Sequence, residues 1–147
     1  MIIQTKYFDE VEINEADIIK FQNGLPGFLD EKQFVLMNLE DTVFQVLQSV
    51  ETQALAFIVV NPFQFKSDYA FVLDNQVVEQ LKIESNEDVA ILSIVTLKES
   101  LKESTVNLKA PLVINTEINE GKQYIIQKTD YTTKESIFTA PIQKEDE

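Results

Sequence analysis

The sequence predicts a small, mainly β domain, an antiparallel barrel-like fold or a sandwich, with one or two short helices. Short apolar runs of strand length recur along the 147 residues, and glycine, proline or asparagine stands near many of their ends. Helical spacing is scarce by comparison. Many short strands joined by tight turns are typical of small barrels and sandwiches. A chain of this length can bury a hydrophobic core of its own.

No internal repeat or linker divides the chain, so we expect a single domain over residues 1–142. The last five residues, 143–147, read Gln-Lys-Glu-Asp-Glu, which indicates a charged, frayed tail. The first residues lack the pattern of a secretion signal, and no apolar run approaches the roughly 20 residues that span a bilayer. These features favour a cytoplasmic protein with no membrane partner.

The strands are predicted from the period and length of the apolar runs. Val11 and Ile13 alternate with Glu10, Glu12 and Asn14, which is the period of a half-buried strand. Further apolar runs predict strands at residues 18–19, 34–37, 43–50, 55–60 and 89–97. The last two runs are apolar on both faces, which favours central strands covered on each side.

A hairpin is predicted near the end of the domain. Asn119-Glu120-Gly121 separates the apolar residues 112–114 from residues 124–126, and its glycine suits the positive φ of a hairpin turn. Alternate polar residues over 115–121 resemble the start of a calcium-binding loop. However, the glycine falls one position late and the terminal glutamate is missing, so we interpret the segment as a turn.

One helix is predicted to begin at Asp74, which is a favourable N-cap residue. Val77, Val78 and Leu81 would then lie on its buried face.

The composition argues against catalysis. The chain contains no cysteine and no histidine, and all 12 of its basic residues are lysines. These absences remove thiol nucleophiles, thiolate and imidazole metal ligands, and the commonest general base near neutral pH. We therefore predict no catalytic residue, no metal site and no cofactor. The alternative is a hydrolase or lyase that uses two of the 25 carboxylates, and it would require a facing pair in a cleft.

The net charge of −13 predicts the kind of partner. At that charge the molecule repels nucleic acids and anionic membranes and attracts basic proteins. The absence of arginine also removes the side chain best suited to bidentate phosphate recognition. We expect no direct contact with nucleic acid.

Asn23 to Phe28 holds two of the three glycines. A glycine-rich loop can bind phosphate where it joins a strand to a helix, but here Leu29-Asp30-Glu31 follows. We interpret Gly24, Pro26 and Gly27 as a structural turn. In a type II turn, Pro26 would fix φ and Gly27 would take the third position.

Residues 61–69 form the candidate binding segment. Aromatic and acidic side chains gather here just after a predicted buried strand, at Asn61, Phe63, Phe65, Asp68 and Tyr69. Exposed aromatic side chains next to acids suit a protein interface, because aromatic anchors carry much of the binding energy. The competing interpretation is that Phe63 and Phe65 fold back over the barrel mouth as part of the core.

Several segments together resemble a known family. They are, in chain order, Ile19-Lys20-Phe21, Gly24 to Phe28, Leu47-Gln48-Ser49, Leu55 to Phe63, Asp68-Tyr69 and Asn107 to Asn115. In this order and spacing they resemble the FliW family of flagellar assembly factors. The chain departs from the family pattern at Asn61, where Asp is frequent, and at residues 52–54, where a proline is frequent.

The resemblance implies a barrel-like fold with short helices and a role in protein binding. It implies two partners, flagellin and the RNA-binding translational repressor CsrA. Flagellin held in the cell would occupy this protein, and export of flagellin would free it to bind CsrA and relieve repression of flagellin translation. A simple export chaperone for flagellin, with no regulatory partner, is the remaining alternative.

Overall fold

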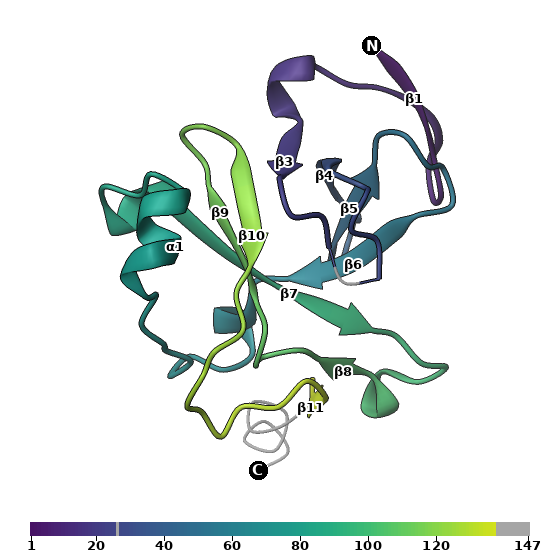
Figure 1. Ribbon diagram of the computed structural model, residues 1–147. Coiled ribbons are helices and arrows are strands. Elements are labelled where there is room, and N and C mark those ends of the chain that lie inside the picture. The colour runs from purple at the N-terminus through teal and green to yellow at the C-terminus, as the bar shows by residue number, and fades with distance from the viewer. Residues whose placement is uncertain (26, 138–147) are drawn as a thin grey trace.

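Seven strands close into a barrel in the computed structural model, which describes residues 1–25 and 27–137 (Figure 1). The barrel strands are β3 (Ile19–Phe21), β4 (Gln33–Asn38), β5 (Gln45–Ser49), β6 (Ala56–Val60), β7 (Val89–Thr96), β9 (Leu112–Asn115) and β10 (Glu120–Gln123). They follow one another in this order around the barrel, because β9 pairs with both β7 and β10 and β10 returns to β3. The predicted class, a small β-barrel with short helices, is confirmed.

One pair of neighbouring barrel strands is parallel, although an antiparallel barrel was predicted. The strands β3 and β10 are parallel, with Lys20 opposite Glu120 and Phe21 opposite Gly121. All other neighbouring barrel strands are antiparallel.

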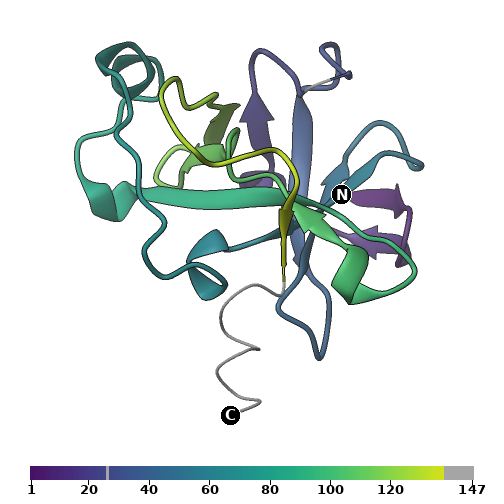
Figure 2. The same ribbon diagram turned by 90° about the horizontal axis from the view of Figure 1, so that it is seen from below.

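Two further pieces of sheet extend from the barrel. The end of β7 pairs with β8 (Thr105–Val106), which pairs in turn with β11 (Glu135–Ser136). The hairpin of β1 (Ile2–Thr5) and β2 (Asp9–Glu12) forms a separate sheet. Figures 1 and 2 show this hairpin on the side of the barrel away from α1. The strand predicted around Val11 is thus confirmed, but it lies outside the barrel.

The alternation of side chains divides the core into two clusters. One cluster fills the barrel and includes Phe21, Phe34, Leu47 and Val59, and the rings of Phe21 and Phe34 meet edge to face at 5.7 Å. The other cluster lies on the outer face of β5, β6, β7 and β9, where the segments 61–83 and 124–137 cover it. This double coverage explains why β6 and β7 are apolar on both faces, as predicted.

The predicted helix is confirmed as α1 (Asn75–Gln80). Asp74 is its N-cap, and the Asp74 carboxylate accepts a hydrogen bond from the Val77 N–H at 3.0 Å. Val77 and Leu81 are buried in the outer cluster and fix the helix to the barrel. Short 3₁₀ turns occur at Glu15–Asp17, Pro62–Gln64, Asn86–Asp88 and Leu101–Glu103.

The predicted hairpin is correct in place and wrong in detail. Asn119, not Gly121, takes the positive φ, at 52°. Gly121 lies inside β10, where a Cβ atom would come within 2.7 Å of the Phe21 ring. The strand predicted at 124–126 is not formed, since β10 ends at Gln123. Single hydrogen bonds continue the pairing instead, from the Tyr124 and Ile126 N–H groups to the carbonyls of Pro111 and Lys109.

No helix among the described residues is long and apolar enough to cross a membrane. The end of the predicted domain, residues 138–142, and the predicted tail, residues 143–147, lie outside the described residues.

Candidate functional site

The candidate segment begins where β6 leaves the barrel. Asn61 follows the strand and caps a 3₁₀ turn, η2 (Pro62–Gln64), because its Oδ1 accepts the Phe63 N–H at 3.0 Å. The Phe65 N–H then donates to the Pro62 carbonyl at 3.1 Å. Asn61 therefore uses its side chain to fix the turn that positions Phe63.

Phe63 stands between two hollows. The inner hollow, about 570 Å³, opens at the barrel mouth and is lined in part by Ile19, Gln45 and Asn61. The outer hollow, about 630 Å³, lies against the outer face of β7 and is lined in part by Phe71, Val72, Leu73, Val78 and Ile83. Both hollows are also lined by Phe63, Val89 and Ile91. Phe63, which is 41% exposed, forms a ridge between them.

The ring of Tyr69 packs against Phe63 and against two further aromatic rings. The Tyr69 ring lies 5.5 Å from the Phe63 ring, 5.5 Å from Phe71 and 4.7 Å from Tyr131, measured between ring centroids. Only 2% of Tyr69 is exposed, and its hydroxyl donates to the Leu108 carbonyl at 2.7 Å. Burial, with a smaller contribution from Tyr131, raises the pKa of Tyr69 well above its ordinary value, so the phenol stays neutral.

This burial does not fit the interpretation of Tyr69 as an exposed anchor. A side chain at that depth cannot meet a partner directly. From within the core, its ring packs against the ring of Phe63 instead.

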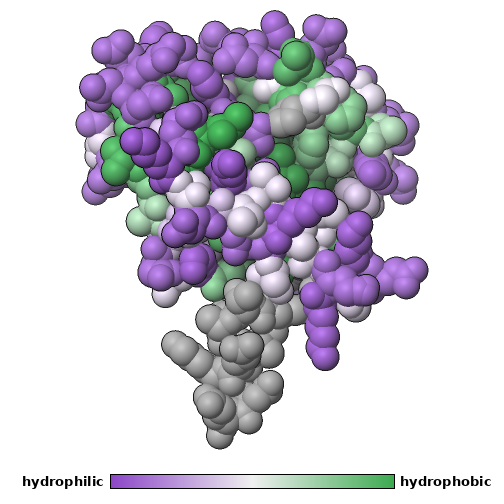
Figure 3. Space-filling view, turned by 60° about the horizontal axis from the view of Figure 1, so that its bottom comes forward, coloured by the Kyte–Doolittle hydropathy of each residue, from purple (hydrophilic) through white to green (hydrophobic). Residues whose placement is uncertain are grey.

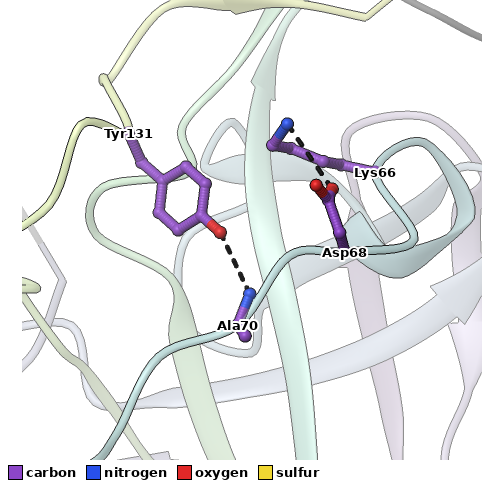
Figure 4. Close-up of polar contacts among 4 residues, drawn as sticks. All are labelled: Lys66, Asp68, Ala70 and Tyr131. Carbon is purple, nitrogen blue, oxygen red and sulfur yellow. Dashed lines mark hydrogen bonds and ion pairs between the residues drawn. The ribbon is translucent and has the colours of Figure 1, made fainter.

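Lys66 and Asp68 lie at the outer border of the segment (Figure 4). The Lys66 Nζ and the Asp68 Oδ1 are 3.5 Å apart, and the Asp68 side chain is 82% exposed. Nearby, the Ala70 N–H donates to the Tyr131 hydroxyl at 3.1 Å, which fixes the chain as it leaves the segment (Figure 4). An exposed ion pair of this kind contributes little to stability.

The five predicted residues therefore lie at three depths. Asn61, Phe63 and Asp68 are exposed, Phe65 is half-buried and Tyr69 is buried. Phe65 packs against the outer cluster, whereas Phe63 is exposed, so the competing interpretation, in which Phe63 and Phe65 both return to the core, does not hold for Phe63. The sequence reasoning missed the outer hollow. The run Phe71-Val72-Leu73, which is apolar but follows no strand or helix period, was the available signal.

The glycine-containing loop lies at the other mouth of the barrel. Gly24 and Gly27 both have positive φ, at 69° and 79°. The Phe28 N–H donates to the Leu25 carbonyl at 2.8 Å, and Gly27 occupies the third position of the turn that this bond closes. Leu25 is buried in the barrel core. Pro26 lies outside the described residues.

The chemistry of the two hollows suits binding. Apolar and amide side chains dominate their walls, and no carboxylate is among the described residues that line them. Within residues 1–25 and 27–137, no group of three Asp or Glu residues is placed to hold a metal ion. A wall of this composition favours apolar side chains over a polar substrate.

Comparisons with known proteins agree with one another. The model of the FliW protein family matches residues 2–137. The flagellar assembly factor FliW of Geobacillus kaustophilus (strain HTA426) is 46% identical over 144 residues, covering 98% of this chain and all of the relative. The Bacillus licheniformis protein of the same name is 51% identical over 138 residues, covering 93% and 96%. A crystal structure of the flagellar assembly factor FliW superposes with a TM-score of 0.91 at 45% identity, covering 96% of this chain and 99% of that one.

Proposed function

The chain belongs to the FliW family of flagellar assembly factors, and from that premise we propose that it acts in the cytoplasm by binding other proteins, without catalysis. The proposed partners are the translational repressor CsrA and flagellin. Flagellin that has not been exported occupies the protein and leaves CsrA free to repress flagellin translation. Export of flagellin frees the protein, which then binds CsrA and relieves the repression.

The match over residues 2–137 is the observation that carries this proposal. The net charge of −13 supports it, because an RNA-binding repressor presents a positive surface to phosphates. A strongly acidic body bound close to that surface disfavours RNA by repulsion, even where it leaves the RNA site uncovered. Coupling between two sites is typically about 1–3 kcal/mol.

Size-exclusion chromatography of the purified protein with flagellin and CsrA, singly and together, tests the exchange. Two mutually exclusive binary complexes are expected. A ternary complex would show that the partners use separate sites and would contradict direct exchange. Failure to bind CsrA, with flagellin binding intact, would favour the export chaperone instead. A pull-down from cytoplasm adds an independent readout, because CsrA co-purifies only in the regulatory case.

Repulsion as the cause of antagonism has its own test. Variants in which exposed acids are changed to their amides should antagonise RNA binding by CsrA less, and the difference should shrink as salt screens the charges. Full antagonism by a neutralised variant that still binds CsrA tightly would eliminate repulsion as the main cause.

We place part of the contact surface on residues 61–69. Phe65→Ala with Asp68→Ala should weaken a partner complex while the protein stays folded, because Asp68 is exposed and Phe65 half-buried. Leu29→Ala with Asp30→Ala is the matched control, since it removes an exposed apolar and an exposed acidic side chain at the other mouth. Unchanged affinity with a melting temperature several degrees lower would instead assign Phe65 to the core.

A further inference from the structure

We infer that the outer hollow, between α1 and the outer face of β7, receives an apolar protein segment flanked by lysine or arginine. This inference rests on the proposed function, because it requires a protein partner. It adds the place where the partner binds and the chemistry of the part that enters.

The hollow exposes apolar side chains that the fold itself leaves uncovered. Val72 is 87% exposed although it stands between two apolar neighbours, Phe71 and Leu73. Val89 and Ile91 are only half-buried although they belong to a barrel strand and each has a partner in β9. Figure 3 shows apolar patches among hydrophilic residues on the side where α1 lies in Figure 1. Contiguous exposed apolar surface with a polar rim is typical of a binding site.

The negative charge around the outer hollow favours a partner segment with basic flanks. Residues 68–88, which supply most of its outer wall, contain six acidic residues and one lysine, hence a net charge of −5. Glu84 directly follows the wall residue Ile83, and Glu87 directly follows Asn86, and both acids are exposed. Complementary charge favours a partner segment with basic flanks, and the same field repels a nucleic acid or an anionic membrane.

The walls are held in place before anything binds. The Tyr131 hydroxyl accepts the Ala70 N–H at 3.1 Å, and the Tyr124 hydroxyl donates to the Val72 carbonyl at 3.3 Å. The Asp74 cap fixes the start of α1 on the other side. A preformed site spends little binding free energy on ordering itself.

The ridge at Phe63 determines how many apolar side chains of the partner segment the site can receive. Because the inner and outer hollows meet at Phe63, an apolar side chain can be received on each side of its ring. A partner segment with two neighbouring large apolar side chains therefore matches the site better than one with a single anchor.

The test uses a short fluorescein-labelled peptide with a Leu-Phe-Leu centre and two lysines at each end, followed by fluorescence anisotropy. Val72→Ser should bind it about tenfold more weakly, since Val72 provides exposed apolar contact. Glu84→Gln with Glu87→Gln should weaken binding about threefold at low salt and have little effect near 1 M salt. A peptide with glutamate in place of every lysine should not bind.

Matched controls are available at residues that do not line the outer hollow. Leu29→Ser removes an exposed apolar side chain, and Glu51→Gln with Glu99→Gln removes two exposed acids, and both should bind the peptide like the unaltered chain. Amide NMR shifts caused by the peptide should gather at residues 70–73 and 83–91. Failure of the unaltered chain to bind the peptide, or equal binding by Val72→Ser, would overturn the inference.

The proposed function and the binding role of the outer hollow can be refuted independently of each other. If the unaltered chain forms complexes with CsrA and flagellin, and Val72→Ser binds both with unchanged affinity, the hollow is not the site although the proposed function stands. If the unaltered chain binds neither protein, the proposed function fails, whatever the peptide result.

Discussion

Ser93 carries a buried hydroxyl that finds no hydrogen-bond partner among the residues that the structure describes. It lies in β7 opposite Val60, within the apolar surroundings of the core. Ser104 is equally buried, but its hydroxyl donates to the Ser100 carbonyl at 3.1 Å and accepts the Lys98 N–H at 2.9 Å. An unpaired buried polar group costs about 1–3 kcal/mol, whereas a paired one contributes about 1 kcal/mol.

The two serines should therefore respond in opposite ways to removal of the hydroxyl. Ser93→Ala should leave the free energy of unfolding unchanged or raise it by about 1 kcal/mol, and Ser104→Ala should lower it by about 1–2 kcal/mol. Urea unfolding of the two variants measures both values. A loss at Ser93 as large as that at Ser104 would mean that the Ser93 hydroxyl has a partner in solution.

Tyr69 predicts how stability changes in alkali. Its pKa is raised by burial, while in the unfolded chain a tyrosine ionises near its ordinary pKa of 10.0. Above that pH the native state holds a proton that the unfolded state has lost, so the free energy of unfolding falls as pH rises. Below that pH this contribution is fully present.

Tyr69→Phe isolates the effect. At pH 8 the variant should be about 1 kcal/mol less stable, because the Leu108 carbonyl loses its buried donor. Near pH 11 the difference in free energy of unfolding between the two proteins should be smaller. The unaltered protein loses stability there through Tyr69, whereas phenylalanine cannot ionise and the other titrating groups are common to both proteins. Urea unfolding at the two pH values gives the comparison, and a constant gap would refute the linkage.

At the scale of the element, the loop between β3 and β4 depends on two glycines with different constraints. A Cβ atom at Gly24 would overlap the Leu29 carbonyl oxygen, whereas one at Gly27 would meet nothing within 4 Å. Both glycines have positive φ, which costs an L-residue about 1–2 kcal/mol. The difference between the two positions is therefore steric.

Gly27→Ala should cost about 1 kcal/mol of stability, and Gly24→Ala clearly more, because Leu29 backbone atoms must move as well. Thermal melts of both variants give the ranking. Equal losses would show that the loop shifts freely at Gly24.

Elements with a local cause were predictable from the sequence. The start of α1 follows from a cap and an apolar spacing that lie within a few residues of Asp74. Gly121 was misread because its role is tertiary: it makes room for Phe21, a residue one hundred positions away in the chain. Tyr69 was misread for the same reason, since its burial depends on Tyr131 and Leu108. The parallel pairing of β3 and β10 leaves no local signal at all.

At the scale of the whole molecule, charge dominates. Against the net charge of −13, Lys66 with Asp68 is the one salt bridge within the part of the chain that the structure describes. Screening by salt therefore removes more repulsion than attraction.

The melting temperature should rise by a few degrees as sodium chloride increases from about 10 mM to about 0.5 M, where the Debye length falls from roughly 30 Å to a few ångströms. Scanning calorimetry measures the trend. Potassium chloride should give the same result if screening is the cause, and a falling melting temperature would contradict it.

The parallel pairing of β3 with β10 closes the barrel, and it also determines when during synthesis the fold can be completed. Lys20 in β3 gains its partner Glu120 only after β10 has been synthesised. Until then, the edges of β3 and β9 that face β10 in the barrel have no neighbouring strand. Unpaired strand edges of this kind readily pair with other chains. A closed barrel that can meet another protein thus arises only after residues 120–123 have been synthesised.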